Sequence, residues 1–146
     1  HDVHALEAGG GTATLWISMK KMYSGHVDQT AFGTMGHFGM SYFKWIVICD
    51  DDIDINDPFM RDWVMAWRVR PDKDIKLIPD TASVELDPSS FEPGKTQADI
   101  SGAKMIIDAT KKWETEGFDR EWPTEIVMTD EVREKVDKRW REYGLG

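Results

Sequence analysis

The sequence has a single cysteine, so no disulfide bond can form within the chain. Cys49 lies in the apolar run 45–49, where a thiol is usually buried and inert. We therefore expect a reducing compartment, the cytoplasm. Basic residues are also scarce, since 18 Lys and Arg stand against 27 acidic residues and give a net charge of -9. Such a chain repels phosphate backbones and anionic membrane surfaces, which argues against nucleic acid and membrane partners.

Long apolar runs are missing as well. None approaches the roughly 20 residues of a membrane span, and no secretory signal pattern opens the chain. The chain begins at His1 rather than at a methionine, so we expect a piece of a longer protein. Its 146 residues, 40% hydrophobic and 31% charged, suit one globular domain with a real core.

Strand-like and helix-like segments alternate along the chain. Apolar or β-branched runs predict strands over 13–19, 45–49, 75–78 and 104–107, the third of them stopped by Pro79. Helical periodicity predicts helices from Ser24 to about residue 38 and from Pro58 to about residue 67. Residues 80–102 read as a long loop, which in a compact domain is usually functional. This order predicts a three-layer α/β domain with a mostly parallel sheet.

The last segment, 129–146, has the clearest helical pattern and is separated from the domain of residues 1–128. Thr129 can cap the helix, and acid-then-base pairs four residues apart line its surface. Its narrow apolar stripe must be buried against its own domain or against a neighbour. We expect an oligomer contact there, formed by Val132, Val136, Trp140 and Tyr143.

An acidic cluster follows the apolar run 45–49. Carboxylates at the carboxyl end of a parallel strand occupy the usual ligand edge of an α/β fold, and several together can hold a divalent metal. One interpretation is therefore the metal corner of a glycosyltransferase, with Asp50, Asp52 and Asp54 as ligands. The other, which we favour, is a solvated turn whose last member, Asp57, caps the helix that starts at Pro58.

Several blocks of the sequence, in this order, resemble the UbiD-like carboxy-lyases, the prenylated-FMN-dependent decarboxylases. They span most of the chain and are residues 20–26, 45–54, 63–74, 86–89 and 103–110. The resemblance implies a C-terminal, Rossmann-like domain that closes over the substrate and forms the dimer. It also implies that prenylated FMN, a divalent metal (Mn) and potassium are held mainly by an upstream flavin-binding domain.

The resemblance further implies what this chain contributes to the reaction. The family's catalytic Glu-Arg-Glu set lies upstream, so we expect no catalytic residue, no metal ligand and no cofactor of its own here, and an isolated chain without activity. The loop around Val84 and Leu86 resembles the family's substrate-facing loop, and His4 falls near another pocket-lining stretch. The implied function is non-oxidative decarboxylation, or reversible carboxylation, of an aromatic or phenolic acid. A purely structural oligomerisation domain and a glycosyltransferase fragment remain the alternatives.

Overall fold

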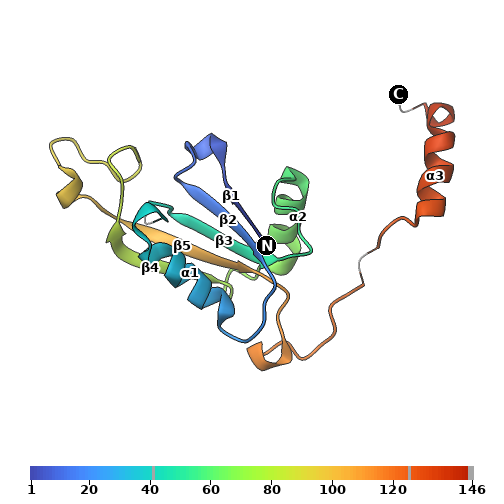
Figure 1. The fold of residues 1–146 in the computed structure, drawn as a ribbon, viewed down its shortest axis with the longest axis horizontal. Coiled ribbons are helices and arrows are strands. Elements are labelled where there is room, and N and C mark those ends of the chain that lie inside the picture. The colour runs from blue at the N-terminus through green and yellow to red at the C-terminus, as the bar shows by residue number, and fades with distance from the viewer. Residues whose placement is uncertain (41, 125, 145–146) are drawn as a thin grey trace.

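The computed structural model describes residues 1–40, 42–124 and 126–144 (Figure 1). Five strands form one sheet in the order β1-β2-β3-β5-β4. The strands are β1 Asp2–Ala5, β2 Thr14–Met19, β3 Trp45–Asp50, β4 Ile75–Ala82 and β5 Ser101–Ala109. The α-helices are α1 His26–Gly36, α2 Pro58–Arg68 and α3 Asp130–Lys138. The 3-10 turns are η1 Glu7–Gly9, η2 Phe38–Met40, η3 Gln97–Asp99, η4 Glu114–Glu116 and η5 Trp140–Tyr143.

The sheet is mixed, and the prediction of a mostly parallel sheet is wrong in that respect. The three central strands β2, β3 and β5 are parallel, while β1 pairs antiparallel with β2 and β4 antiparallel with β5. The apolar run of β3 is buried on both faces, as expected of a central parallel strand. β1 escapes sequence reasoning because it is only four residues long, so its alternation of polar and apolar residues is too brief to stand out.

β4 continues past Pro79, where the sequence predicts its end. It runs to Ala82, with a break in register between Ile78 and Thr81. Asp80, in this break, has a φ of 54°, a left-handed conformation that aspartate tolerates better than most residues. β4 is an edge strand, so the N–H that proline lacks is not needed for pairing on its outer side.

Helices cover both faces of the sheet, which confirms the α/β class. Alternate residues of β3 point to opposite sides: Ile46 and Ile48 pack with α1, and Val47 and Cys49 pack with α2. α1 and α2 each contribute a fully buried apolar side chain, Ala31 and Val64 respectively. Burial raises the pKa of the Cys49 thiol to about 12, which makes it the inert core residue predicted.

The start of α2 is the one that the sequence predicts, whereas the start of α1 differs from the prediction. The Asp57 side chain accepts a hydrogen bond from the Phe59 N–H (2.9 Å), and Pro58 is the first helical residue of α2, which confirms the predicted cap. In α1 the cap position is taken by Gly25, with a φ of 84°. Ser24 instead forms a hydrogen bond with Thr115 (2.8 Å).

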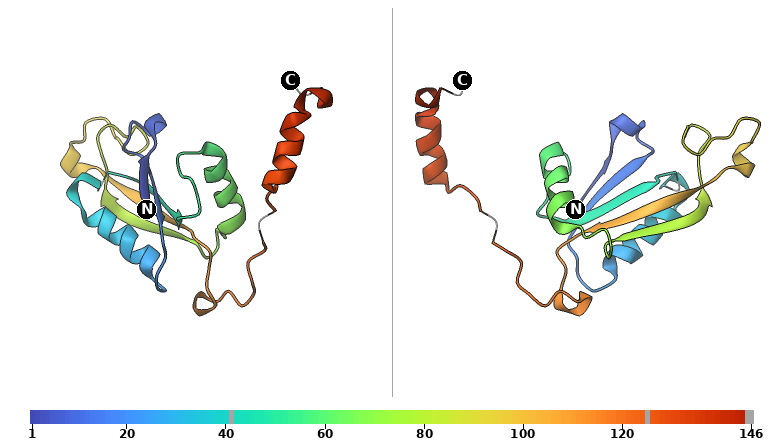
Figure 2. Two further views of the ribbon diagram at one scale, coloured as in Figure 1. Left: turned by 45° about the vertical axis from the view of Figure 1, so that its right-hand side comes forward. Right: turned by 180° about the vertical axis from the view of Figure 1, so that it is seen from behind.

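The terminal helix lies apart from the sheet, at the end of an extended segment (Figures 1 and 2). Thr129 Oγ1 accepts a hydrogen bond from the Val132 N–H (3.4 Å), so the predicted cap is present. The α-helical geometry ends at Lys138, and η5 continues it through Tyr143. Among the described residues, none of the helices is long and apolar enough to cross a membrane.

Candidate functional site

The carboxyl ends of the parallel strands carry a buried lysine. Lys21 follows β2, and only 1% of its side chain is exposed. Its Nζ donates three hydrogen bonds, to Thr110 Oγ1 (3.0 Å), the Lys111 carbonyl (2.6 Å) and Glu116 Oε2 (2.7 Å). The ammonium also lies 4.8 Å from the centre of the Trp113 ring. An ammonium has three donors, so Lys21 holds the segment after β5 against the end of β2 with all of them used.

The acidic turn after β3 is neutralised by cations from two other elements. Arg68, at the end of α2, donates to both carboxylate oxygens of Asp52 (2.9 and 2.8 Å) and reaches Asp50 at 3.4 Å. Lys111 donates its backbone N–H to Asp50 (2.6 Å) and its Nζ to Asp52 (2.9 Å). The Arg68 hydrogen bond lowers the pKa of Asp52 to about 2, whereas burial raises the pKa of Asp50 above its usual value.

These contacts favour the turn over the metal corner. Asp50 and Asp52 already have cationic partners, and Asp54 accepts a hydrogen bond from the Asn56 N–H (2.9 Å) within the turn. In the ranges 1–40, 42–124 and 126–144, no three His, Cys, Asp or Glu side chains are grouped closely enough to hold a metal ion. The carboxylates therefore stabilise a turn between β3 and α2.

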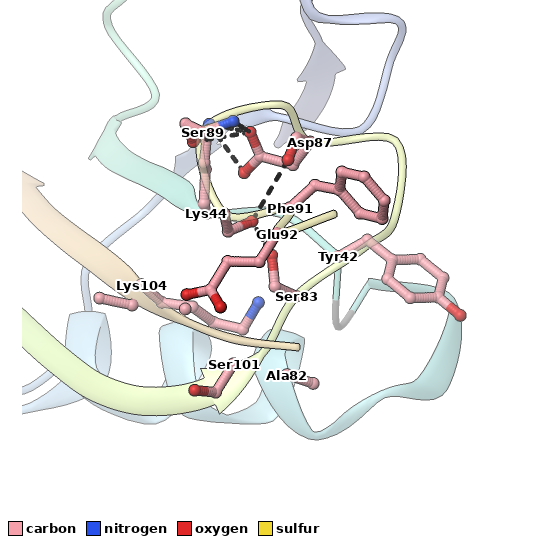
Figure 3. A pocket seen from close by; sticks show the side chains of 13 residues that line it. Tyr42, Lys44, Ala82, Ser83, Asp87, Ser89, Phe91, Glu92, Ser101 and Lys104 are labelled. Atoms are coloured by element: carbon pink, nitrogen blue, oxygen red, sulfur yellow. Dashed lines mark hydrogen bonds and ion pairs between the residues drawn. The ribbon is translucent and has the colours of Figure 1, made fainter. Parts of the chain in front are cut away.

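The opposite, amino end of β3 and β5 has a hollow of about 350 Å³ beneath the loop after β4 (Figure 3). An ion pair ties this loop to the sheet. Lys44, just before β3, donates to both oxygens of Asp87 (2.9 Å each) and to Ser89 Oγ (3.0 Å). Burial opposes ionisation of Asp87, but hydrogen bonds from Ser89 and Lys44 outweigh it and lower the pKa of Asp87 to about 2.

A second lysine lies in the wall of the hollow. Lys104 of β5 is 4% exposed, and its Nζ donates to the Phe43 carbonyl (2.9 Å). Burial lowers the pKa of Lys104. The loop itself is closed by a hydrogen bond between the hydroxyls of Ser83 and Ser90 (2.5 Å). The hollow is therefore polar, with two lysines and several hydroxyl groups around it.

The residues predicted to face a substrate do not all lie together. Val84 is half-buried at the base of the tied loop, where its carbonyl accepts from the Asp87 N–H (2.9 Å), and Leu86 projects from the loop with 85% of its surface exposed. His4 lies on β1, beside Trp16 and at the other edge of the sheet from β4. The chain alone thus places Val84 and Leu86 on one loop and His4 far from it in strand order.

Sequence reasoning missed the polar residues that fix this loop. Lys44 sits next to a buried strand, and Asp87-Pro88-Ser89 is a pattern typical of a side-chain-capped turn. Those two signals could have indicated a tied loop. Their pairing could not be foreseen, because 43 residues separate the two partners.

The four predicted contact residues at the C-terminal end show no burial against the domain. Val132, Trp140 and Tyr143 are 48%, 46% and 42% exposed, and Val136 is half-buried. Trp140 and Tyr143 belong to η5 rather than to α3. The structure thus leaves the stripe, Val132, Val136, Trp140 and Tyr143, uncovered.

The sequence of this chain matches a known family model and several curated relatives. Residues 1–109 match the model of the UbiD_C family, the 3-octaprenyl-4-hydroxybenzoate carboxy-lyase C-terminal domain. An uncharacterized protein of Aquifex aeolicus is 38% identical over 144 residues, which are 99% of this chain and 28% of that protein. An uncharacterized protein of Archaeoglobus fulgidus is 35% identical over 86% of this chain and 25% of its own length. The chain spans about a quarter of these curated relatives.

Solved structures of decarboxylases share the fold. The vanillic acid decarboxylase of Sedimentibacter hydroxybenzoicus, in open form, is 26% identical with a TM-score of 0.72, covering 99% of this chain and 29% of its own. The UbiD-class enzyme HmfF of Pelotomaculum thermopropionicum, in complex with FMN, is 29% identical with a TM-score of 0.65. The match covers 84% of this chain and 26% of the HmfF chain. The apo 3,4-dihydroxybenzoic acid decarboxylase of Klebsiella pneumoniae is 28% identical with a TM-score of 0.67. The match covers 97% of this chain and 28% of the decarboxylase chain.

Proposed function

This chain belongs to the family of 3-octaprenyl-4-hydroxybenzoate carboxy-lyase C-terminal domains, and we propose that it serves a longer, non-oxidative decarboxylase of aromatic or phenolic acids. The observation that carries the proposal is the family match over residues 1–109. The likeness to vanillic acid and 3,4-dihydroxybenzoic acid decarboxylases supports the substrate class. The same chemistry run backwards is a carboxylation, so the proposal covers a reversible carboxylase as well.

The cofactor of the longer enzyme is proposed to be prenylated FMN with Mn and potassium, held by residues outside this chain. The likeness to HmfF in complex with FMN supports a flavin. The residues described here do not fit one by themselves. Hollows of about 350 and 280 Å³ are lined mainly by serine, lysine and carboxylate side chains, whereas a flavin ring needs apolar walls.

The contribution of this domain to the substrate pocket is proposed to come from Val84 and Leu86, with His4 as a further candidate. The ion pair of Asp87 with Lys44 and the hydrogen bond between Ser83 and Ser90 fix this loop on the sheet. The exposed apolar side chain of Leu86 is therefore held in a defined position, where it can contact whatever faces the loop. A held apolar wall selects substrates by shape, at about 1–3 kcal/mol for each methylene-sized change.

Exchanging Val84 in the full-length enzyme tests this contribution. We expect Val84→Phe to change the relative kcat/KM across a panel of aromatic acids while the flavin content stays the same. Leu77→Phe is the matched control, because Leu77 lies on β4 away from the loop and is 61% exposed. An unchanged substrate profile in Val84→Phe would argue against a substrate-facing loop.

The isolated chain is proposed to be inactive. The buried cations Lys21 and Arg68 are paired with Glu116 and Asp52 of the chain itself, and the resemblance places the catalytic residues upstream. Turnover of any aromatic acid by the purified 146-residue chain, measured as product formation, would contradict this assignment.

The stripe is proposed to contact a second copy of the protein, as the dimers implied by the family resemblance suggest. Its exposure supports an outside partner. Trp140→Ala should shift the dimer towards monomer in sedimentation, because a tryptophan at an interface centre can contribute about 2 kcal/mol or more. Unchanged sedimentation of Trp140→Ala would place the stripe outside the dimer contact.

A further inference from the structure

The hollow beneath the loop after β4 has an aromatic side and a polar side. In Figure 3 the rings of Tyr42 and Phe91 stand on one side, and Glu92, Ser101 and Lys104 lie on the other. The two rings give too little apolar wall for a flavin but can stack on a single benzene ring. The volume of about 350 Å³ is at the small end of the range for ligand pockets, about 300–1,000 Å³. This hollow therefore suits a small ligand with one ring and polar substituents.

Turns on both sides hold Phe91 and Glu92 in place. The Phe91 N–H donates to the Asp87 carbonyl (3.0 Å). The Lys95 N–H donates to the Glu92 carbonyl (3.1 Å). Within residues 92–95, a proline at the second position and a glycine with a φ of 85° at the third are the pattern of a type II turn. The backbone is thus fixed where it presents these two side chains to the hollow.

Glu92 differs from the other charged residues around the hollow. Lys44 and Asp87 are paired with each other. Lys104 is buried, and its Nζ donates to a backbone carbonyl. Glu92 is exposed and makes no hydrogen bond or ion pair with the part of the chain that the structure describes. Its carboxylate points into the hollow (Figure 3), so the group that the site offers to a ligand is a negatively charged acceptor.

A carboxylate in this place selects a ligand by its hydrogen-bond donors. An ionised carboxylate accepts hydrogen bonds and donates none, so Glu92 can bind hydroxyl groups. Its negative charge repels the carboxylate of an aromatic acid. The hydroxyl of Ser101, at the start of β5, also has no hydrogen bond to the described residues and can bond to a second substituent. The polar side of the hollow therefore fits ring hydroxyl groups.

We propose that the hollow binds the phenolic end of the substrate, with Glu92 accepting hydrogen bonds from its ring hydroxyl groups. The inference rests on the proposed decarboxylase function and deepens it, because it names ring-hydroxylated acids as the substrate class. The carboxylate of the acid then points away from this hollow, towards the catalytic residues that the resemblance places upstream. A site built to bond a hydroxyl group rejects analogues that lack it, so Glu92 is a specificity-determining residue.

Equilibrium binding of catechol and benzoate to the full-length enzyme tests the role of Glu92. Catechol carries the phenolic end of such a substrate, and benzoate carries the carboxylate end. We expect Glu92→Gln to raise the Kd of catechol at least about tenfold, because hydrogen bonds to a charged group are lost. Benzoate should bind no more weakly than before. Glu114→Gln is the matched control, because Glu114 is exposed in η4 at the other end of the sheet.

A second variant tests the aromatic side of the hollow. Phe91→Ala removes one of the two rings and should raise the Kd of catechol severalfold. Phe59→Ala is its control, because Phe59 lies on α2 and is 71% exposed. Circular dichroism should show all four variants folded. Weaker catechol binding in Phe91→Ala but not in Glu92→Gln would mean that the hydroxyl groups do not contact Glu92, which overturns its assignment.

The remaining outcomes separate this inference from the proposed function. If the full-length enzyme decarboxylates a phenolic acid while catechol fails to bind at millimolar concentration, the assignment of the hollow is wrong and the decarboxylase stands. Tighter benzoate binding in Glu92→Gln, with catechol binding unchanged, would mean that the hollow faces the carboxylate end and would overturn the orientation. If catechol binding depends on Glu92 but no aromatic acid is decarboxylated, the phenol site stands and the proposed function is wrong.

Discussion

Similar charged residues lie at the two ends of the sheet, but at the carboxyl end they fill the edge, whereas at the amino end they border a hollow. At the carboxyl end, Lys21, Arg68 and Lys111 bind the carboxylates and carbonyls around them, and Lys21 and Arg68 are almost fully buried. At the amino end, Lys44 and Lys104 border a hollow of about 350 Å³. The carboxyl end of an α/β sheet usually takes the ligand. Here the chain's own side chains occupy the centre of that edge.

The difference is one of burial, because the chain supplies the counter-charge at both ends: Lys44 pairs with Asp87 but is 31% exposed, whereas Lys21 and Arg68 are almost fully buried in their pairs. A buried cation needs partners, and a chain that provides them internally gains a rigid edge at the expense of a binding site. The carboxyl edge joins the ends of β2, β3, β5 and α2, so its ion pairs act as structure. At the amino edge a partly exposed ion pair fixes one loop, so removing that pair should change stability less and only locally.

Removing Arg68 should produce the largest effect. Arg68→Ala leaves Asp50 and Asp52 without their guanidinium partner at a partly buried edge, and we expect the free energy of unfolding to fall by about 3–5 kcal/mol. Arg70→Ala is the matched control, because Arg70 pairs with Asp72 at the surface, both more than 60% exposed. It should cost no more than about 1 kcal/mol. Equal losses in urea denaturation of the two variants would show that the carboxyl edge is not structural.

Much of the fold was predictable from local pattern. The runs 13–19, 45–49 and 104–107, the Asp57–Pro58 cap and the helices they separate all appear near their expected bounds. What local pattern could not give was pairing direction. β1 has only four residues, too few to read as a strand, and β5 returns antiparallel to β4 after the long loop that follows Ala82, so the sheet became mixed. The Rossmann-like topology stays a prediction.

The site was less predictable, for a physical reason. The acidic turn was visible as a run of carboxylates, and its interpretation depended on Arg68 and Lys111, which lie 16 and 59 residues from Asp52. Long-range ion pairs leave no periodic signal in a sequence. The pocket roles of Val84, Leu86 and His4 came from resemblance and stay predictions, although the structure places the first two on one tied loop.

Acid should weaken the protein through Asp87 by an intermediate amount. The pKa of Asp87 is lowered from 3.8 to about 2, so its contribution to stability is complete above pH 4 and is lost as the pH falls towards 2. We expect a loss on the order of 1–2 kcal/mol over this window. Asp87→Asn should show a shallower fall in the free energy of unfolding between pH 4 and 2. Asp119→Asn, at an exposed position, is the control, and an equal slope in both variants would contradict this role.

Lys44→Met should have the smallest effect on global stability and a clear local one. Lys44 is 31% exposed in its pair with Asp87, so its loss should cost under about 1 kcal/mol. The loop, however, loses the contact that ties Asp87 and Ser89 to the start of β3. We therefore expect faster proteolytic cleavage and faster amide exchange within residues 83–91, with little change elsewhere. Lys76→Met removes the same charge from an exposed pair with Asp28 and should leave loop cleavage unchanged. If the unaltered protein, Lys44→Met and Lys76→Met were all cleaved at the same rate, the hydrogen bond between Ser83 and Ser90 at the base of the loop would hold the loop in place without Lys44.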